Sequence, residues 1–288
     1  MSGAKYKVLW LSFFQEREPS ETSRKKRKEQ QMPKLHFLGT CSGTEPMEGR
    51  NHVSFIINAG GYNYWFDAGE NCSRSAYLSG VDLLSVRAIF ISHPHYDHIG
   101  GLDGIMWNIR KIVTYYRKNL KSGRLDVHVP VMESWDGIYA MLKNTEGNFK
   151  CPYEIKSHLV RDGVVFEDEN IKVTAFHNHH LQSEEGEGWL SYSYLIETEG
   201  KKIVFSGDVR DVYDLEPLVA EGCDCLLMET GHHKVSDVAQ YVNSRDIKKL
   251  FFVHHGLEIM NDWEAAKEKI KAVNVPTVLT NDGDVFDL

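Results

Sequence analysis

The run His93-Pro94-His95-Tyr96-Asp97-His98 most constrains what this 288-residue chain can fold into, because three imidazoles and a carboxylate fall within six positions. An apolar, β-rich run stands before it and two glycines follow it, which predicts a loop between a buried strand and a helix. Imidazole and carboxylate groups are the ligands that zinc, manganese and iron take in proteins. The loop therefore predicts a metal site, with His93 and His95 on one ion and Asp97 and His98 on a second.

Histidines elsewhere in the chain also stand directly after apolar, strand-like runs. Ten of the 14 histidines fall into four such clusters, a grouping that random placement would not produce. One histidine after the strand expected at 171–176 should complete the first metal site. The clusters beyond the first loop contain His177, His179, His180, His232, His233, His254 and His255.

Aspartates end two further predicted strands. Asp208 closes the segment Ser206-Gly207-Asp208 after the strand expected at 202–205, and its glycine allows close approach of the backbone. Taken with the histidine loop, Asp208 is the best candidate for a carboxylate shared by two ions. Asp67 follows the strand expected at 62–66, and taken alone it would be read as a turn residue.

Composition limits the class of protein. The chain is 42% hydrophobic and 26% charged, as in a soluble globular protein. A net charge of −8 argues against a surface that coats nucleic acid generally, although it leaves room for a local basic patch. Five cysteines without a Cys-x-x-Cys pair favour the reducing cytoplasm. With no apolar run near 18 residues, we expect no transmembrane helix and no membrane partner.

Residues 1–31 are expected to form a disordered basic extension, and residues 32–288 a single globular domain that contains the predicted metal site. The extension contains Arg24-Lys25-Lys26-Arg27-Lys28, a kind of run that can also bind RNA or act as an address. An apolar run at 8–14 resembles a truncated signal-peptide core, but no small-residue cleavage site follows it. Met32 is a candidate for the original start of translation.

Strand patterns alternate with helix patterns, which indicates the α/β class. Residues 143–161 read as irregular, and Trp107, Tyr115 and Tyr116 as packing groups rather than a base-stacking platform. Strands are expected at 35–38, 53–58, 62–66, 86–91, 127–131, 171–176, 189–197, 202–205, 223–228 and 249–253, with two short strands around a turn at 282–283. Helices are expected at 73–78, 102–116, 134–142, 235–242 and 262–272.

The motif His-x-His-x-Asp-His after an apolar strand resembles the signature of the metallo-β-lactamase superfamily. The opening Leu38-Gly39-Thr40, Gly207-Asp208 and the cluster at His233 are most similar to its ribonuclease Z (tRNA 3′-end-processing endonuclease) and cyclic phosphodiesterase branches. The resemblance covers about residues 35–288. It implies a four-layer αββα sandwich with the site at one edge of the sheets.

The resemblance also implies roles for individual residues. Asp67 would accept a hydrogen bond from the outer nitrogen of a metal-bound histidine. His233 would protonate the leaving group, with His232 as the alternative, and Asp97 would help to orient a hydroxide that bridges the ions. The implied ligand sets are His93, His95 and His180 (or His179) for one ion, and Asp97, His98 and His254 for the other, with Asp208 shared.

These residues together predict a dinuclear metal-dependent hydrolase, with zinc as the default ion and manganese or iron as alternatives. A phosphodiester, in RNA or in a small cyclic nucleotide, is the first choice of substrate, and a lactone, ester or thioester is the second. The absence of a Gly/Pro-rich arm within 143–161 weighs against tRNA. Residues 182–188 are a candidate substrate loop, with an ordinary surface connection as the alternative. No residues are assigned to substrate binding. A homodimer is also expected.

Two other classes fit less well. An oxygen-reducing di-iron protein of this superfamily would carry a glutamate where this chain has His95. A non-catalytic metal-binding module would lack one of the ligands, and none is missing.

Overall fold

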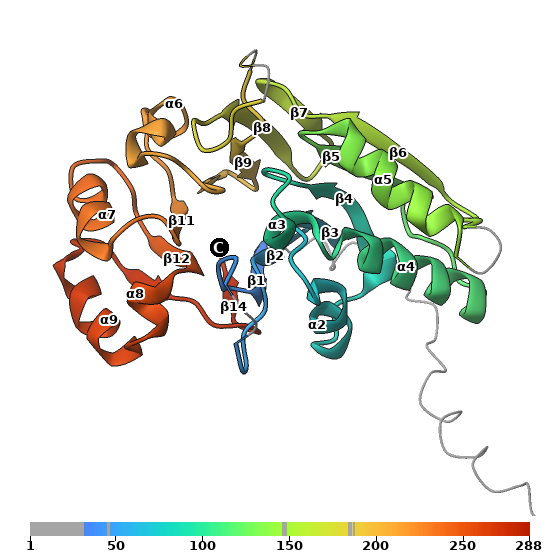
Figure 1. Ribbon diagram of the computed structural model, residues 1–288, viewed down its shortest axis with the longest axis horizontal. Helices are drawn as coiled ribbons and strands as arrows, with labels where there is room; N and C mark the ends of the chain where they lie inside the picture. The colour runs from blue at the N-terminus through green and yellow to red at the C-terminus, as the bar shows by residue number, and fades with distance from the viewer. Residues whose placement is uncertain (1–31, 45–46, 146–148, 184–185, 187) are drawn as a thin grey trace, which may run out of the picture. The chain divides into compact units, whose positions relative to one another are not determined.

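The computed structural model describes residues 32–44, 47–145, 149–183, 186 and 188–288. The basic extension expected at 1–31 and part of the candidate substrate loop lie outside these ranges. Within the described residues, two seven-stranded β-sheets pack face to face, and helices cover their outer faces (Figure 1). None of the described helices is long and apolar enough to cross a membrane.

The first sheet combines an antiparallel meander with parallel strands, in the order β14-β1-β2-β3-β4-β5-β6. Strands β3 to β6 run parallel, and the last strand of the chain pairs antiparallel with the first. The strands are β1 (Lys34–Gly39), β2 (Ser54–Ala59), β3 (Tyr62–Phe66), β4 (Val86–Phe90), β5 (Arg124–Val129), β6 (Glu154–Leu159) and β14 (Val285–Asp287).

The second sheet follows the same plan, in the order β13-β12-β11-β10-β9-β8-β7. Strands β10 to β13 run parallel, and β11 and β12 are buried along their whole length, as expected for strands covered on both faces. The strands are β7 (Gly163–Glu167), β8 (Lys172–His177), β9 (Tyr192–Thr198), β10 (Lys201–Phe205), β11 (Cys225–Thr230), β12 (Leu250–His255) and β13 (Thr277–Leu279).

Helices form the two outer layers, so the structure has three apolar cores: one between the sheets and one under each helical layer. Helices α2, α4 and α5 cover the first sheet, and α6, α7 and α9 cover the second (Figure 1). The helices are α2 (Cys72–Leu78), α3 (Tyr96–Ile99), α4 (Leu102–Tyr116), α5 (Met132–Lys143), α6 (Glu216–Val219), α7 (Val235–Val242), α8 (Leu257–Met260) and α9 (Trp263–Lys269), with 3₁₀ turns η1 (Leu83–Ser85), η2 (Val212–Leu215) and η3 (Ile270–Ala272).

The carboxyl ends of the strands position the site. Strands β3 and β4 run parallel, as do β10, β11 and β12, and β8 runs in the direction of β10 because each is antiparallel to β9. The sheets are joined at this edge by hydrogen bonds from Tyr192 N to Ser92 O (3.0 Å) and from Tyr194 Oη to Ile91 O (2.7 Å). Loops leaving these strands can therefore meet at one place.

Two expectations from the sequence differ from the structure. The segment expected to be irregular contains β6, and its neighbour in sequence, β7, was not expected as a strand. Tyr115 and Tyr116, expected to be packing groups, are exposed by 80% and 58%. Trp107 is half-buried against the core under α4, in agreement with the expected packing role.

Candidate metal centre

Asp67, which directly follows β3, fixes the position of the loop at residues 92–98 by hydrogen bonds. Its carboxylate accepts hydrogen bonds from Ser92 N (2.7 Å) and Ser92 Oγ (2.8 Å), and its Oδ2 lies 2.6 Å from Nδ1 of His98. Asp67 is fully buried and has φ of 50°, a left-handed conformation that few non-glycine residues adopt. Because Nδ1 of His98 faces Asp67, its Nε2 is the ring nitrogen available to a metal.

The first ligand set brings together His93, His95, His180 and one oxygen of Asp208. Nδ1 of His95 lies 3.0 Å from Nε2 of His93 and 3.3 Å from Nε2 of His180. Oδ2 of Asp208 lies 3.6 Å from Nε2 of His93 and 3.8 Å from Nε2 of His180. All four atoms therefore surround one point.

The second ligand set consists of Asp97, His98 and His254. Nε2 of His254 lies 3.0 Å from Oδ2 of Asp97 and 3.2 Å from Nε2 of His98. Oδ1 of Asp208 lies 3.3 Å from Nε2 of His98. Asp208 therefore turns one carboxylate oxygen toward each ligand set, an arrangement in which one carboxylate can bind two ions.

Both sets fit divalent metal ions. Ligand atoms around a tetrahedral zinc lie about 3.3 Å apart when the metal–ligand bonds are about 2.0–2.1 Å long, and the separations above scatter around that value. Oδ1 of Asp208 and Nδ1 of His254 are buried without a hydrogen-bond partner. A buried polar atom left unpaired costs free energy, and for Asp208 Oδ1 a bound cation would remove that cost.

A β-bulge aims His254 into the site. Between β11 and β12 the pairing passes from Glu229–Val253 to Thr230–His255, so His254 is the extra residue, with φ of 49°. Bulges re-aim side chains in this way. His255 turns elsewhere, and its Nε2 lies 2.9 Å from the carbonyl oxygen of Thr280.

The electrostatics of the cluster favour positive charge. Burial opposes protonation of His254, but the charge of Asp208, the hydrogen bond to Asp97 and the nearby carboxylate of Glu229 outweigh it and raise the pKa of His254 to about 9. Burial would raise the pKa of Asp208, yet the neighbouring imidazoles, His254 first, hold it well below its usual range. His93 behaves differently, because burial and then the charge of His98 keep its pKa well below 6.5.

The structure separates His232 from its neighbour His233. His232 lines the cleft, and its Nδ1 lies 3.1 Å from Oε1 of Glu229 and 3.8 Å from Oδ2 of Asp208. The hydrogen bond with Glu229 raises the pKa of His232. His233 instead places Nε2 2.9 Å from the carbonyl oxygen of Val209. Of the two, His232 lines the cleft beside the ligands, whereas Nε2 of His233 is paired with the backbone outside it.

Glu229 was missed as a site residue. It is fully buried, at the end of β11, and it contacts both His232 and His233. A lone carboxylate that closes an apolar strand, as Asp67 and Asp208 also do, is the sequence signal that could have identified it.

His179 and His180 also differ in their surroundings. His180 joins the first ligand set, with its side chain 12% exposed. His179 is 47% exposed and pairs with Asp214 through Nδ1, so it belongs to no ligand set among the described residues.

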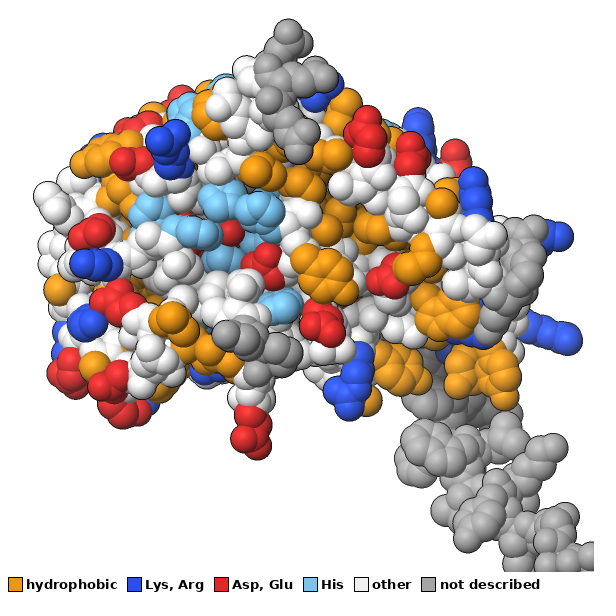
Figure 2. Space-filling view, in the orientation of Figure 1, with side chains coloured by type: hydrophobic (Ala, Val, Ile, Leu, Met, Phe, Trp, Pro, Cys, Tyr) orange, Lys and Arg blue, Asp and Glu red, His pale blue; other side chains and the backbone are white. Residues whose placement is uncertain are grey.

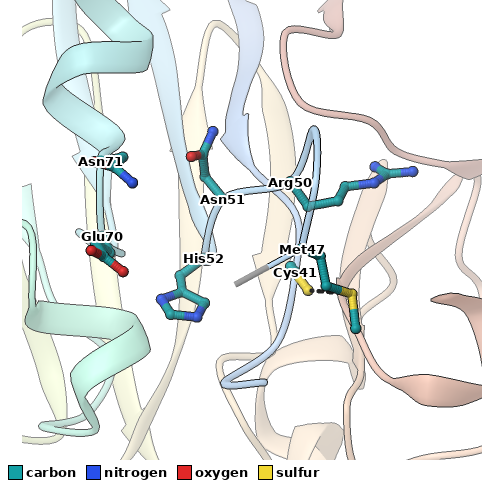
Figure 3. Close-up of a pocket in the computed structure, with 7 residues that line it drawn as sticks. All are labelled: Cys41, Met47, Arg50, Asn51, His52, Glu70 and Asn71. Atoms are coloured by element: carbon teal, nitrogen blue, oxygen red, sulfur yellow. Dashed lines mark hydrogen bonds between the residues drawn. The ribbon is translucent and has the colours of Figure 1, made fainter. Parts of the chain in front are cut away.

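The ligands open into a cleft of about 340 Å³ between the 42–44 loop and the start of α8. On this face, histidine side chains surround acidic ones (Figure 2). A smaller cavity of about 40 Å³ is lined by residues of the 41–52 segment together with Glu70 and Asn71 (Figure 3). There Cys41 Sγ contacts Met47 Sδ at 4.0 Å, and the cavity contains none of the metal ligands.

Two sheets between helical layers, with paired His/Asp ligand sets at one edge, define a protein of the metallo-β-lactamase fold with a candidate metal centre. The profile of the family described as anti-Pycsar protein Apyc1 matches residues 33–275, and the chain belongs to that family.

Relatives and solved structures agree with this assignment. Ribonuclease Z from Archaeoglobus fulgidus is 24% identical over 86% of this chain and 95% of that protein. The metallo-β-lactamase fold protein YhfI from Bacillus subtilis has a TM-score of 0.67 at 13% identity, covering 88% of this chain and 99% of that one. Human tRNase Z, short form, has a TM-score of 0.66 at 20% identity, covering 88% and 98%. The predicted αββα fold, the ribonuclease Z-like relationship and the class of metal-dependent hydrolase with phosphodiesterase character are confirmed.

Proposed function

We propose that this protein hydrolyses a small nucleotide phosphodiester at a centre that holds two divalent metal ions. The observation that carries the proposal is the carboxylate of Asp208, which presents Oδ1 to one ligand set and Oδ2 to the other. The cleft of about 340 Å³ above the ligands has the size of a small-molecule site.

His93, His95 and His180 would hold one ion and Asp97, His98 and His254 the other, with Asp208 shared. Two divalent ions held in this way supply a hydroxide nucleophile at neutral pH and neutralise charge on the phosphoryl group. Asp97 is a ligand whose carboxylate also borders the cleft, where it helps to orient the nucleophile.

His232 holds the proton for the departing oxygen. Glu229 pairs with its Nδ1, which leaves Nε2 as the ring nitrogen that can donate. An oriented histidine that gives a proton to the leaving group typically contributes about 10²- to 10⁴-fold to the rate. The buried carboxylate of Glu229 accepts the hydrogen bond from Nδ1 of His232 and so keeps the ring of His232 in one tautomer.

A small nucleotide is favoured over a long RNA by the charge and by the segment after α5. The net charge of −8 disfavours broad contact with a polyanion. In the described part of residues 143–161, the chain joins the edge of the first sheet as β6. The relatives named ribonuclease Z make RNA the alternative substrate, which the experiment below distinguishes.

The finer assignments belong to the same proposal. Zinc is the proposed ion, because nitrogen and carboxylate ligands at these separations suit it. The five cysteines are unpaired, which supports a cytoplasmic location. Residues 32–288 are the proposed catalytic domain, and the exposed Tyr115 and Tyr116 on α4 are candidates for contacts in a homodimer.

Turnover of several substrates by the zinc-loaded protein tests the proposal. The set contains bis(p-nitrophenyl) phosphate, a nucleoside 3′,5′-cyclic phosphate, a short single-stranded RNA, a lactone and a thioester, with Asp208→Ala as the control. Hydrolysis of the first two that disappears in the control supports the proposal. Efficient cleavage of the RNA would move the substrate class to nucleic acid, and turnover of the lactone or thioester alone would overturn the phosphodiesterase assignment.

A further inference from the structure

A second cleft, also of about 340 Å³, adjoins the metal centre and has no role in the chemistry above. The two clefts share His232, and the metal ligand His180 lines the second one. Its remaining walls are His179, Gln182, Trp189, Val209 and Arg210. A substrate whose phosphoryl group lies at the metal ligands can therefore extend directly into this space.

Asp214 builds this second cleft by holding both of its sides. One carboxylate oxygen of Asp214 pairs with Nδ1 of His179, and the other accepts hydrogen bonds from the backbone N–H of His179 (3.1 Å) and of Arg210 (3.2 Å). The Asp214 side chain is only 6% exposed. The loop after β8 and the segment after β10 are thus joined at one buried carboxylate.

The groups held there are available to a ligand. Nδ1 of His179 is paired with Asp214, and Nε2 has no hydrogen-bond partner among the described residues. Trp189 is half-buried, with its ring 4.6 Å from that of His179 and nearly perpendicular to it. Arg210 is exposed, and no ion pair of its guanidinium is found among the described residues. The cleft thus combines an aromatic wall, a planar cation and an oriented imidazole.

This combination suits a planar heteroaromatic ring that carries carbonyl or ring-nitrogen acceptors. Bases stack on aromatic side chains and on guanidinium planes, while a guanidinium donates hydrogen bonds to acceptors at a ring edge. A second phosphate group could pair with the guanidinium of Arg210 but could not stack on the indole of Trp189. The aromatic wall therefore favours a base over an anion.

We propose that His179, Trp189 and Arg210 form the pocket that binds the base of the substrate nucleotide and so determine specificity, with Asp214 as the positioning residue. The inference rests on the proposed function, because it places the phosphodiester of the same molecule at the metal centre. It assigns the nucleoside part of the substrate to residues that do not take part in bond cleavage.

Two substrates that differ only in the base test the pocket: a nucleoside 3′,5′-cyclic phosphate and methyl riboside 3,5-cyclic phosphate, which lacks the base. In the zinc-loaded wild type we expect kcat/KM to favour the nucleoside by about tenfold to a hundredfold, the range of one base stacked on an aromatic side chain. Trp189→Ala and Arg210→Ala should raise KM for the nucleoside, leave kcat nearly unchanged, and bring the ratio of kcat/KM values close to one.

Arg74→Ala, a change at an exposed arginine on α2, serves as the matched control and should keep the wild-type ratio. Asp214→Asn should lower the ratio partly, because His179 and Arg210 lose their common partner. Equal losses on both substrates, or a ratio unchanged by Trp189→Ala and Arg210→Ala, would overturn the inference. Failure of the wild type to hydrolyse bis(p-nitrophenyl) phosphate would instead overturn the proposed function, and the pocket would then be tested by whether Trp189→Ala weakens binding of a nucleoside monophosphate.

Discussion

At the scale of single residues, the hydrogen bond made by one ring nitrogen of a histidine determines whether the other nitrogen can bind a metal ion or donate a proton. Asp67 shows this for His98, because its Oδ2 lies 2.6 Å from Nδ1. Asp67→Asn keeps the size of the side chain but removes the negative charge. We expect zinc affinity to fall by about tenfold to a hundredfold, the usual effect of losing such a partner, measured by competition with a chromogenic chelator.

Ser92→Ala is the matched comparison, because it removes a neutral hydroxyl that donates to the same carboxylate. Its effect on zinc affinity should be smaller. An Asp67→Asn protein with wild-type zinc affinity would show that the orientation of His98 does not depend on Asp67.

His232 and His233 are neighbours in sequence but differ in their bonding. His232→Ala should lower kcat for a nucleoside cyclic phosphate by about 10²- to 10⁴-fold, because the departing alkoxide needs a proton. The loss should be much smaller on bis(p-nitrophenyl) phosphate, whose leaving group is stable as an anion. His233→Ala should show no such dependence on the leaving group, and the reverse pattern would exchange the two roles.

The metal ligands in the loop at residues 93–98 could be predicted from the sequence because they lie within six consecutive positions. The choices at 179 or 180 and at 232 or 233 could not be made from the sequence. They depend on Asp214 and on the carbonyl oxygen of Val209, partners that only the folded chain brings to these rings.

At the scale of elements, the loops at the strand ends must pass very close to the ligands. A Cβ added to Gly231, directly after β11, would lie 2.6 Å from Nδ1 of His254. Gly231→Ala should therefore displace His254, lower the metal content and reduce turnover. Gly137→Ala, in α5 with open space around it, is the matched control and should stabilise the protein by about 0.4–1 kcal/mol. Normal metal content in Gly231→Ala would contradict this account of the loop.

Most strands with apolar runs could be predicted, whereas the edge strands β6 and β7 could not. No residue of β6 is buried, and β7 has a short apolar run of which only Phe166 is buried, so neither reads as a buried strand. The β-bulge at His254 could not be predicted from the sequence either, because it depends on the register of pairing between β12 and β11. These features depend on neighbouring strands rather than on local sequence.

At the scale of the whole molecule, Asp126 on β5 links the neighbouring strands β4 and β6 at the edge of the first sheet. It pairs with Arg87, with Arg124 (2.9 Å) and with His158 (2.7 Å). Burial would raise the pKa of Asp126, but the hydrogen bonds from Arg87 and His158 outweigh it and lower the pKa. A lowered pKa in the folded state gives stability that is present above the unfolded value of about 3.9 and is lost as pH falls through the folded value.

Asp126→Asn should therefore lower the free energy of unfolding at neutral pH and weaken its dependence on pH below about pH 4. Urea unfolding at several pH values measures both effects. Asp136→Asn, a change at an exposed carboxylate on α5 outside this cluster, is the matched control. Equal pH dependence in Asp126→Asn and the wild type would contradict the role of this carboxylate.

The central claim, that seven side chains from both sheets form one two-ion catalytic centre, is tested most directly by counting zinc ions per chain alongside turnover of bis(p-nitrophenyl) phosphate. The account predicts two ions per wild-type chain, and fewer ions with loss of turnover in Asp208→Asn, while the far-ultraviolet circular dichroism stays unchanged. Full activity of the wild type with one ion or none, or an active Asp208→Asn protein, would contradict it.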